Sequence, residues 1–183
     1  MLAGNPALDF CNTRAGWNAS ESREYLTSYD HLAVWAREAG LADAAATAGL
    51  RRRAAGNPAA ASRALSRARR LRDAVYSACT DPADDEAWEA VAAEARRAAA
   101  AAVLVRGSGW TVPESAGLDL PTMEVARAAG ALLAAPELET VGRCPGHDCG
   151  WLFLDPRGRR RWCTMAVCGN RAKARRHALR ARG

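Results

Sequence analysis

The sequence predicts a mainly α-helical protein with a small cysteine-rich module near its C-terminal end. Alanine supplies 44 of the 183 residues and aromatic residues only 6%, and alanine is the strongest helix former and buries little apolar area. Four of the six cysteines form two close pairs within the last 40 residues. We therefore expect a helical N-terminal domain with a small β-hairpin, followed by a C-terminal four-cysteine finger of treble-clef-like outline, built from a hairpin and a basic helix.

Caps, glycines and prolines divide the N-terminal part of the chain into five predicted helices. Ser28 is a suitable N-cap for the first of them, and Gly40 is a suitable stop. Pro82 suits the first turn of the fourth. Apolar residues on both sides of a Gly-Ser-Gly turn predict a small hairpin. The helices are expected over 29–39, 43–53, 59–79, from 82 onward and over 121–135, and the hairpin strands over 102–105 and 110–112.

Charge is distributed unevenly along the chain, whose net charge is +6. Residues 142–183 hold 11 basic and two acidic residues, a net charge of +9, whereas residues 1–141 hold 15 basic and 18 acidic residues, a net charge of −3. We therefore expect a boundary between a domain over 1–141 and a second over 142–183. A strongly basic segment beside a nearly neutral body indicates a polyanionic partner, with nucleic acid favoured over a membrane surface.

The N-terminal residues lack the cationic start and apolar run of a signal peptide. The longest apolar stretch, 98–105, is far shorter than the ~20 residues that cross a bilayer. We therefore expect a cytoplasmic protein with no membrane partner. Thiols are kept reduced in the cytosol, so closely spaced cysteines favour a metal site over disulfides.

The clustered cysteines follow the spacing C-x4-C-x13-C-x4-C. Two short loops that each donate a pair of thiolates satisfy the tetrahedral coordination that zinc prefers. Pro145, Gly146 and Gly150 favour the tight turn that the first loop needs. The alternatives are disulfides or four free thiols. The sequence predicts one Zn²⁺ ion held by Cys144, Cys149, Cys163 and Cys168.

The other cysteines and the nearby histidine are not expected to bind the metal. His147 should face solvent, because four thiolates already complete the shell. Cys11 and Cys79 are isolated in the sequence and are expected to be small buried hydrophobic residues. A closed four-sulfur shell leaves no position for a catalytic water.

Between and after the cysteine pairs, the sequence predicts a hairpin and a helix. Residues 151–154 are apolar and strand-like, 155–158 form a turn, 159–162 return as a second strand, and 170–182 have helical composition. A module of this size is too small to bury its own core, so the metal should contribute much of its folding free energy. A chelator is therefore expected to unfold the module while the helical body persists.

Basic residues of this module are the candidate contacts to nucleic acid. Arg171 and Arg175 lie four residues apart, as do Arg176 and Arg180, so each pair shares a face of the helix. Arginine forks match phosphate oxygens and guanine edges. The other reading is a solvated basic tail without a partner. The candidates are Arg157, Arg159, Arg160, Arg161, Arg171, Lys173, Arg175, Arg176 and Arg180.

A polar cluster near the N-terminus is a candidate site for a small-molecule effector. Asp9, Asn12, Thr13 and Arg14 lie beside apolar residues of the same segment. They could line a ligand pocket. The competing and favoured reading is a network of caps and turns, because Asp and Asn commonly bond backbone amides.

Enzymatic function is not expected. The sequence has no glycine-rich phosphate loop and no HExxH motif, and none of its three histidines lies in a catalytic motif. The leading expectation is a zinc-containing regulator that binds double-stranded DNA through residues 142–183 and senses a ligand or dimerises through residues 1–141. The alternatives are a protein-interaction module with a purely structural zinc, and an RNA-binding protein. A homodimer would suit a DNA site with two half-sites.

Two segments resemble known families. The motifs CGWLFLD, RRWC and MAVCGNRAKARRH, in order with the four cysteines, resemble the CGNR zinc finger, which is named for the run at 168–171. The segment LDFCNT at 8–13 is similar to the LDFVNT start of the ABATE domain, with Cys11 where valine is common. These families are described as stress-induced bacterial transcription regulators. The resemblance implies zinc at the four cysteines, a DNA-binding C-terminal module and a largely helical N-terminal domain.

Overall fold

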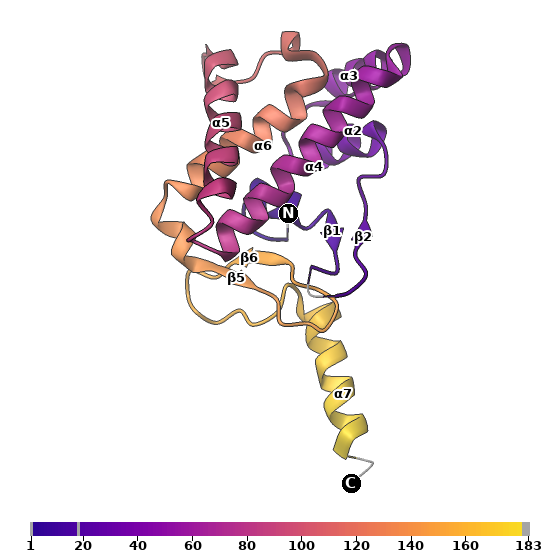
Figure 1. Cartoon of the computed structure of the whole chain (residues 1–183), viewed down its shortest axis with the longest axis vertical. Coiled ribbons are helices and arrows are strands. Elements are labelled where there is room, and N and C mark those ends of the chain that lie inside the picture. The colour runs from indigo at the N-terminus through magenta and orange to yellow at the C-terminus, as the bar shows by residue number, and fades with distance from the viewer. Residues whose placement is uncertain (1, 18, 181–183) are drawn as a thin grey trace.

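The computed structural model describes residues 2–17 and 19–180. They form a helical body, a small finger that packs on one end of it, and a C-terminal helix that projects away from both (Figure 1). The predicted mainly α fold with a small hairpin and a four-cysteine finger is confirmed. The α-helices are α1 (Pro6–Cys11), α2 (Tyr29–Glu38), α3 (Ala44–Gly56), α4 (Pro58–Thr80), α5 (Asp85–Ala101), α6 (Leu120–Leu133) and α7 (Asn170–Arg180).

Short strands form antiparallel pairs rather than a continuous sheet. The predicted hairpin of the body is confirmed, with Leu104 opposite Trp110. The pairs are β1 (Arg14–Ala15) with β2 (Arg23–Glu24), β3 (Val103–Val105) with β4 (Gly109–Thr111), and β5 (Val141–Arg143) with β6 (Leu152–Leu154). Short helical turns complete the chain: η1 (Glu114–Asp119), η2 (Pro136–Thr140) and η3 (Met165–Gly169).

Local capping sets most of the helix starts. The Ser28 hydroxyl accepts a hydrogen bond from the amide of His31 at 3.3 Å, as predicted for the start of α2. The prediction that a helix starts at Pro82 is wrong by three residues. The Asp84 side chain accepts from the amide of Ala87 at 2.9 Å and caps α5 instead, while the residues before it form a turn.

Helix α1 was not predicted, because its six residues are too few to show a helical period. Asn5 caps it by accepting from the amide of Ala7 at 2.8 Å, and Pro6 occupies its first turn. Leu8 and Phe10 are fully buried. The helix lies against α4, α6 and β6, so this short segment lies where the body meets the finger.

Alanine and glycine allow the main helices to pack closely. A Cβ added at Gly130 of α6 would lie 3.0 Å from the Cβ of Ala95 on α5. Val75, Val91 and Val125 are fully buried between α4, α5 and α6. No helix among the described residues is both long and apolar enough to cross a bilayer.

The hairpin of the finger differs from the predicted one. Strand β6 pairs with β5, upstream of the first cysteine, and the return strand predicted over 159–162 is wrong. Asp155 explains the difference, because its two carboxylate oxygens accept from the amides of Arg159 and Arg160 at 2.9 and 2.8 Å and hold that segment in a turn. The predicted C-terminal helix is confirmed as α7, and residues 181–182 of that prediction lie outside the described part of the chain.

Candidate metal centre and its junction with the helical body

The four predicted cysteine ligands converge on one point of the finger. Cys144 follows β5, Cys149 precedes β6, Cys163 precedes η3 and Cys168 lies within it. All four are buried, and their sulfur atoms lie within 4.8 Å of one another. The Sγ atom of Cys163 is 3.6 Å from that of Cys149 and 3.5 Å from that of Cys168.

These residues fit a zinc ion held by four thiolates. Zn–S bonds of ~2.3 Å at tetrahedral angles place the sulfur atoms about 3.8 Å apart, close to the separations seen here. All six cysteines lie in the described part of the chain, and none of them is in a disulfide. A Cβ added at Gly146 would lie 3.0 Å from the Cys168 sulfur and 3.1 Å from the Cys149 Cβ. The first loop therefore packs so closely on the cluster that any side chain at this position would force neighbouring atoms to shift.

Hydrogen bonds between the thiols separate their pKa values. The bond with Cys149 lowers the pKa of the Cys163 thiol to about 5, and the same bond raises the pKa of the Cys149 thiol. Burial raises the pKa of the Cys168 thiol to about 12. Thiolates at this distance repel one another, so ionising several of them together is favourable only beside a cation. A divalent metal that favours sulfur ligands meets this requirement.

Aromatic residues form a small core around the cysteines. Phe153 is buried with them, and Trp151 and Trp162 pack against the cluster. The Arg160 guanidinium lies 4.5 Å from the Phe153 ring centre and donates to the carbonyls of Trp162 and Leu2. The side chain of Arg160, one of the nine candidate nucleic-acid contacts, is therefore engaged in contacts within the protein.

The remaining cysteines and the nearby histidine lie outside the cluster. His147 is 76% exposed and contacts Asp148 at 2.5 Å, which confirms that it faces solvent. Cys11 is fully buried, and burial raises the pKa of its thiol. Cys79 is partly buried, and burial raises the pKa of its thiol to about 12.

Asn12 joins the finger to the body. Its side-chain carbonyl accepts from the amide of Leu152 at 2.9 Å, and its side-chain amide donates to the carbonyl of the same residue at 2.9 Å. The side chain thus acts as a short strand partner for β6. Leu152 itself is fully buried and belongs to the hydrophobic core of the body, not to that of the finger.

Tyr76 and Trp17 hold the metal-binding loop from the side of the body. The Tyr76 hydroxyl donates to the carbonyl of Gly150 at 2.8 Å, and burial raises the pKa of this phenol to about 12, so it remains a donor at neutral pH. The Trp17 ring stacks on the Tyr76 ring with centres 3.6 Å apart. The Trp17 amide donates to the carbonyl of Cys149 at 3.1 Å. The body therefore contacts the backbone of the loop that carries two of the four sulfurs.

We expect Asn12→Ala to destabilise the chain by about 2–4 kcal/mol, because it leaves two buried backbone groups of Leu152 without partners. Urea unfolding followed by circular dichroism measures this change. Asn57→Ala is the matched control, since Asn57 caps α4 at an exposed position and should cost about 1 kcal/mol. Equal losses in the two variants would contradict a special role for Asn12.

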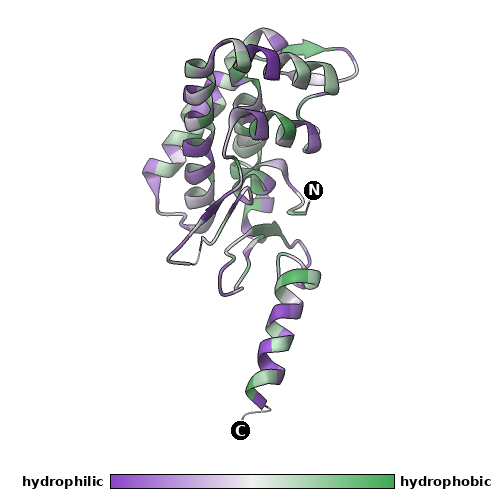
Figure 2. Cartoon of the chain, turned by 90° about the vertical axis from the view of Figure 1, so that its right-hand side faces the viewer, coloured by the Kyte–Doolittle hydropathy of each residue, from purple (hydrophilic) through white to green (hydrophobic). Residues whose placement is uncertain are grey.

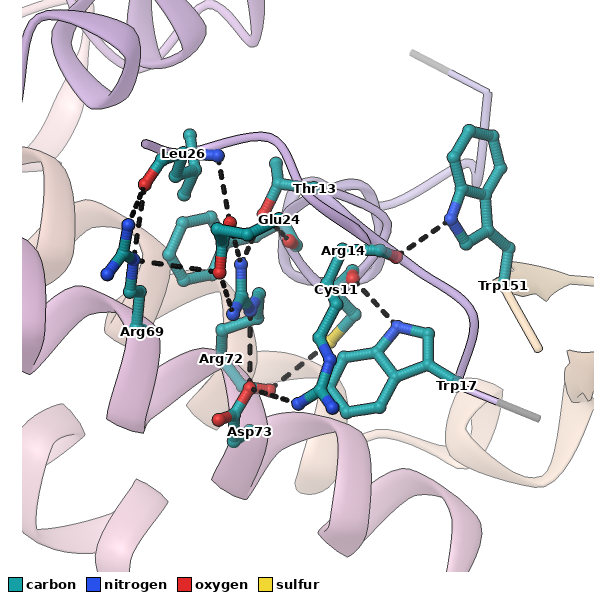
Figure 3. A network of polar contacts seen from close by, with 11 residues as sticks. Cys11, Thr13, Arg14, Trp17, Glu24, Leu26, Arg69, Arg72, Asp73 and Trp151 are labelled. Atoms are coloured by element: carbon teal, nitrogen blue, oxygen red, sulfur yellow. Dashed lines mark hydrogen bonds and ion pairs between the residues drawn. The ribbon is translucent and has the colours of Figure 1, made fainter. Parts of the chain in front are cut away.

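A buried ion pair holds the β1–β2 segment on α4 (Figure 3). Arg72 is 2% exposed, and its two Nη atoms each donate to one carboxylate oxygen of Glu24 at 2.7 Å. Arg69 adds a bond to the carbonyl of Leu26. This pair was not predicted from the sequence. Its signal was present, because Arg72 falls between Ala68 and Val75 on the apolar face of α4.

The contribution of this pair should decrease at acid pH. Burial alone would raise the pKa of Glu24, but hydrogen bonds from Arg72 and the Leu26 amide and the charges of Arg72 and Arg69 lower it below its ordinary value of 4.5. A carboxylate whose pKa is lower in the folded state stabilises the fold above its unfolded pKa, and this stabilisation is lost as pH falls through the folded pKa.

We therefore expect the difference in unfolding free energy between the wild type and Glu24→Gln to be constant from pH 7 to pH 5 and to shrink below about pH 4.5. Urea unfolding of both proteins at each pH measures this difference, in which the loss of metal at low pH is common to both. A difference that stays constant down to pH 3 would contradict the assignment.

Most candidate nucleic-acid contacts lie on the exposed side of the finger. Arg157, Arg159 and Arg161 are exposed in the segment after β6. Helix α7 has no buried residue and stands clear of the body (Figure 2). Its exposed basic residues are Arg171, Lys173, Arg175, Arg176 and Arg180.

The predicted effector-binding residues make contacts within the protein. Asp9 accepts from two amides of the N-terminal segment at 2.9 and 3.1 Å. Asn12 bonds β6, and the Thr13 hydroxyl donates to a carbonyl of α1 at 2.6 Å. The Arg14 guanidinium lies 4.4 Å from the Trp17 ring centre. These side chains tie α1, β1 and β6 together, and their ligand-binding role stays a prediction.

Comparison with protein families finds two matches. A model named ABATE, described as "Putative stress-induced transcription regulator", matches residues 4–136. A model described as "CGNR zinc finger" matches residues 140–181 and covers the four cysteines and α7. The comparison with curated proteins finds no match to the chain.

Proposed function

Because the chain belongs to the ABATE family and ends in a CGNR zinc finger, we propose that it is a zinc-containing transcription regulator whose finger and helix α7 bind double-stranded DNA. The proposal is for a binding protein, not an enzyme, that acts in the cytoplasm. Its N-terminal domain would sense a ligand or form the contact between two copies.

The exposure and basic composition of helix α7 are the main support for this proposal. Its 11 residues include five basic side chains, and none of its residues is buried. A free helix of this length extends about 16 Å, and the major groove of B-DNA is about 12 Å wide and accepts one helix. Its exposed arginine and lysine side chains can contact phosphates, and the arginines can also contact guanine edges.

The cysteine cluster supports the base of this helix. Thr164 caps the turn η3 by accepting from the amide of Val167 at 3.2 Å, and η3 carries Cys168 and continues directly into α7. Zinc bound by the four thiolates would contribute folding free energy and would not supply a reactive centre, because its shell is complete. We therefore expect DNA binding to require the metal.

Fluorescence anisotropy with a duplex selected from a random pool tests the proposal. We expect the affinity to fall steeply with salt, and Arg175→Glu/Arg176→Glu to weaken binding at least about tenfold and to lower the salt slope by about 2. A chelator should abolish binding.

The control is Arg52→Glu/Arg106→Glu, which makes the same charge change at two exposed positions of the body and should leave binding within about twofold, because neither residue is near α7. The proposal is wrong if the zinc-loaded protein shows no salt-sensitive DNA binding, or if both double variants lose affinity equally. If the protein bound RNA more tightly than duplex DNA, RNA and not DNA would be its partner.

A further inference from the structure

A crevice of the helical body collects three arginines from one face of α4. Arg63, Arg67 and Arg70 are spaced by four and three residues, so their side chains lie on one side of the helix. They line a cavity of about 470 Å³ together with Glu94 of α5 and with Leu118 and Asp119 of η1. Cavities of this size hold small molecules.

The acidic groups of the crevice are already neutralised. Arg67 donates to one oxygen of Glu94 at 2.8 Å, and Arg97 lies 3.5 Å from the other. Asp119 pairs with Arg97 at 3.2 Å. The cavity therefore has a surplus of positive charge that resides on the two outer arginines.

Arg63 and Arg70 supply that surplus. Within residues 2–17 and 19–180, neither side chain has a carboxylate within ion-pair distance. Both are exposed at the crevice. Their Cα atoms are about 10.5 Å apart along the helix, because a residue advances about 1.5 Å. Arg67 lies four residues from Arg63 and three from Arg70, like charges at these spacings repel one another weakly, and a bound anion would relieve the repulsion.

We propose that this crevice binds a small phosphorylated molecule, with phosphate groups held by Arg63 and Arg70. Arginine forks bind phosphate oxygens in pairs, and two arginines about 10.5 Å apart at Cα suit a ligand with two phosphate groups. DNA is a poorer fit, because Glu94 and Asp119 form the opposite wall and the site is concave.

The inference names a ligand class for the sensing role, and in that respect it rests on the proposed function. Binding can be measured without DNA, so the two proposals fail separately. The probe is 1,3-propanediol bisphosphate, titrated by calorimetry into the zinc-loaded full chain at low ionic strength. Glutarate, a dicarboxylate with the same three-methylene spacer between its acid groups, separates phosphate recognition from carboxylate recognition.

We expect one bisphosphate per chain, weaker binding of glutarate, and at least about a tenfold loss of affinity in Arg63→Gln/Arg70→Gln. Arg175→Gln/Arg176→Gln makes the same charge change on α7 and should leave bisphosphate affinity within about twofold. Arg63→Lys/Arg70→Lys keeps both positive charges but loses the paired hydrogen bonds of the guanidinium groups, and it should bind the bisphosphate with intermediate affinity. Thermal unfolding checks that each variant is folded.

Three results would overturn the proposal: no binding by the wild type at millimolar bisphosphate, equal losses in the two Gln double variants, or glutarate binding as tightly as the bisphosphate. DNA binding by Arg63→Gln/Arg70→Gln should match the wild type, which keeps this site distinct from the DNA-binding surface.

Discussion

Removing zinc is expected to destabilise the whole protein and not only its finger. Cys163→Ser, or chelation of the wild type, should lower the free energy of unfolding by about 5 kcal/mol and the melting temperature by about 10–20 °C. The reason is that Leu152 belongs to the core of the body, that Asn12 holds the backbone of Leu152, and that Tyr76 holds the backbone of Gly150. When the finger loses its metal, the body loses β6, which is one of the elements on which α1 packs.

Circular dichroism at 222 nm during thermal unfolding measures this effect, because most of the helical signal comes from the body. Cys79→Ser is the matched control, since Cys79 lies outside the cluster and partly exposed, and it should cost about 1 kcal/mol. The sequence alone suggested that the body would survive chelation. A helical transition that keeps its midpoint after chelation would restore that view and contradict the shared core.

Glu24→Ala is expected to cost about 3 kcal/mol, because it leaves both Nη atoms of the buried Arg72 guanidinium without a carboxylate and only its Nε paired, with Asp73 at 3.3 Å. Arg72 is 2% exposed and has few routes to water. Adding Arg72→Met to this variant should recover part of the loss, because an apolar side chain of similar length removes the incompletely paired buried charge and keeps the packing. Urea unfolding of the two single variants, the double variant and the wild type forms a complete mutant cycle.

An exposed ion pair of the same chain provides the control. Glu89 and Arg96 pair on α5 with side chains 70% and 67% exposed, so Glu89→Ala should change the unfolding free energy by less than about 0.5 kcal/mol. If Glu24→Ala cost no more than Glu89→Ala, or if Arg72→Met made the Glu24→Ala variant still less stable, the buried pair would not have the role assigned to it.

Features that depend on contacts between residues close in the sequence could be predicted from the sequence. Ser28 caps α2 with an amide three residues away, and Pro145 and Gly146 shape the first cysteine loop. The spacing of the cysteines predicted that four of them form one cluster, because each pair lies within one short loop. The exact start of a helix still depends on which local contact is stronger. Helix α5 is capped by Asp84 and does not begin at Pro82 as predicted.

Contacts between residues far apart in the sequence could not be predicted from it. Asn12 and Leu152 are 140 positions apart, Tyr76 and Gly150 are 74 apart, and Glu24 and Arg72 are 48 apart. The same limit explains the finger hairpin, where Asp155 turns the chain away and β6 pairs with β5 instead. Helix α1 and the ion pair of Arg72 also depend on what packs against them.

The sequence by itself determined the helical class, the four cysteines of the candidate metal centre and the basic C-terminal helix. Each of these follows from propensity, spacing or charge within a short stretch of chain. Only the tertiary structure decided that Asn12 and Trp17 join the body to the finger, and that Arg63 and Arg70 face one crevice with the acidic groups of η1 and α5. These features depend on which surfaces meet when the chain is compact, and a burial pattern along one helix does not specify its partner.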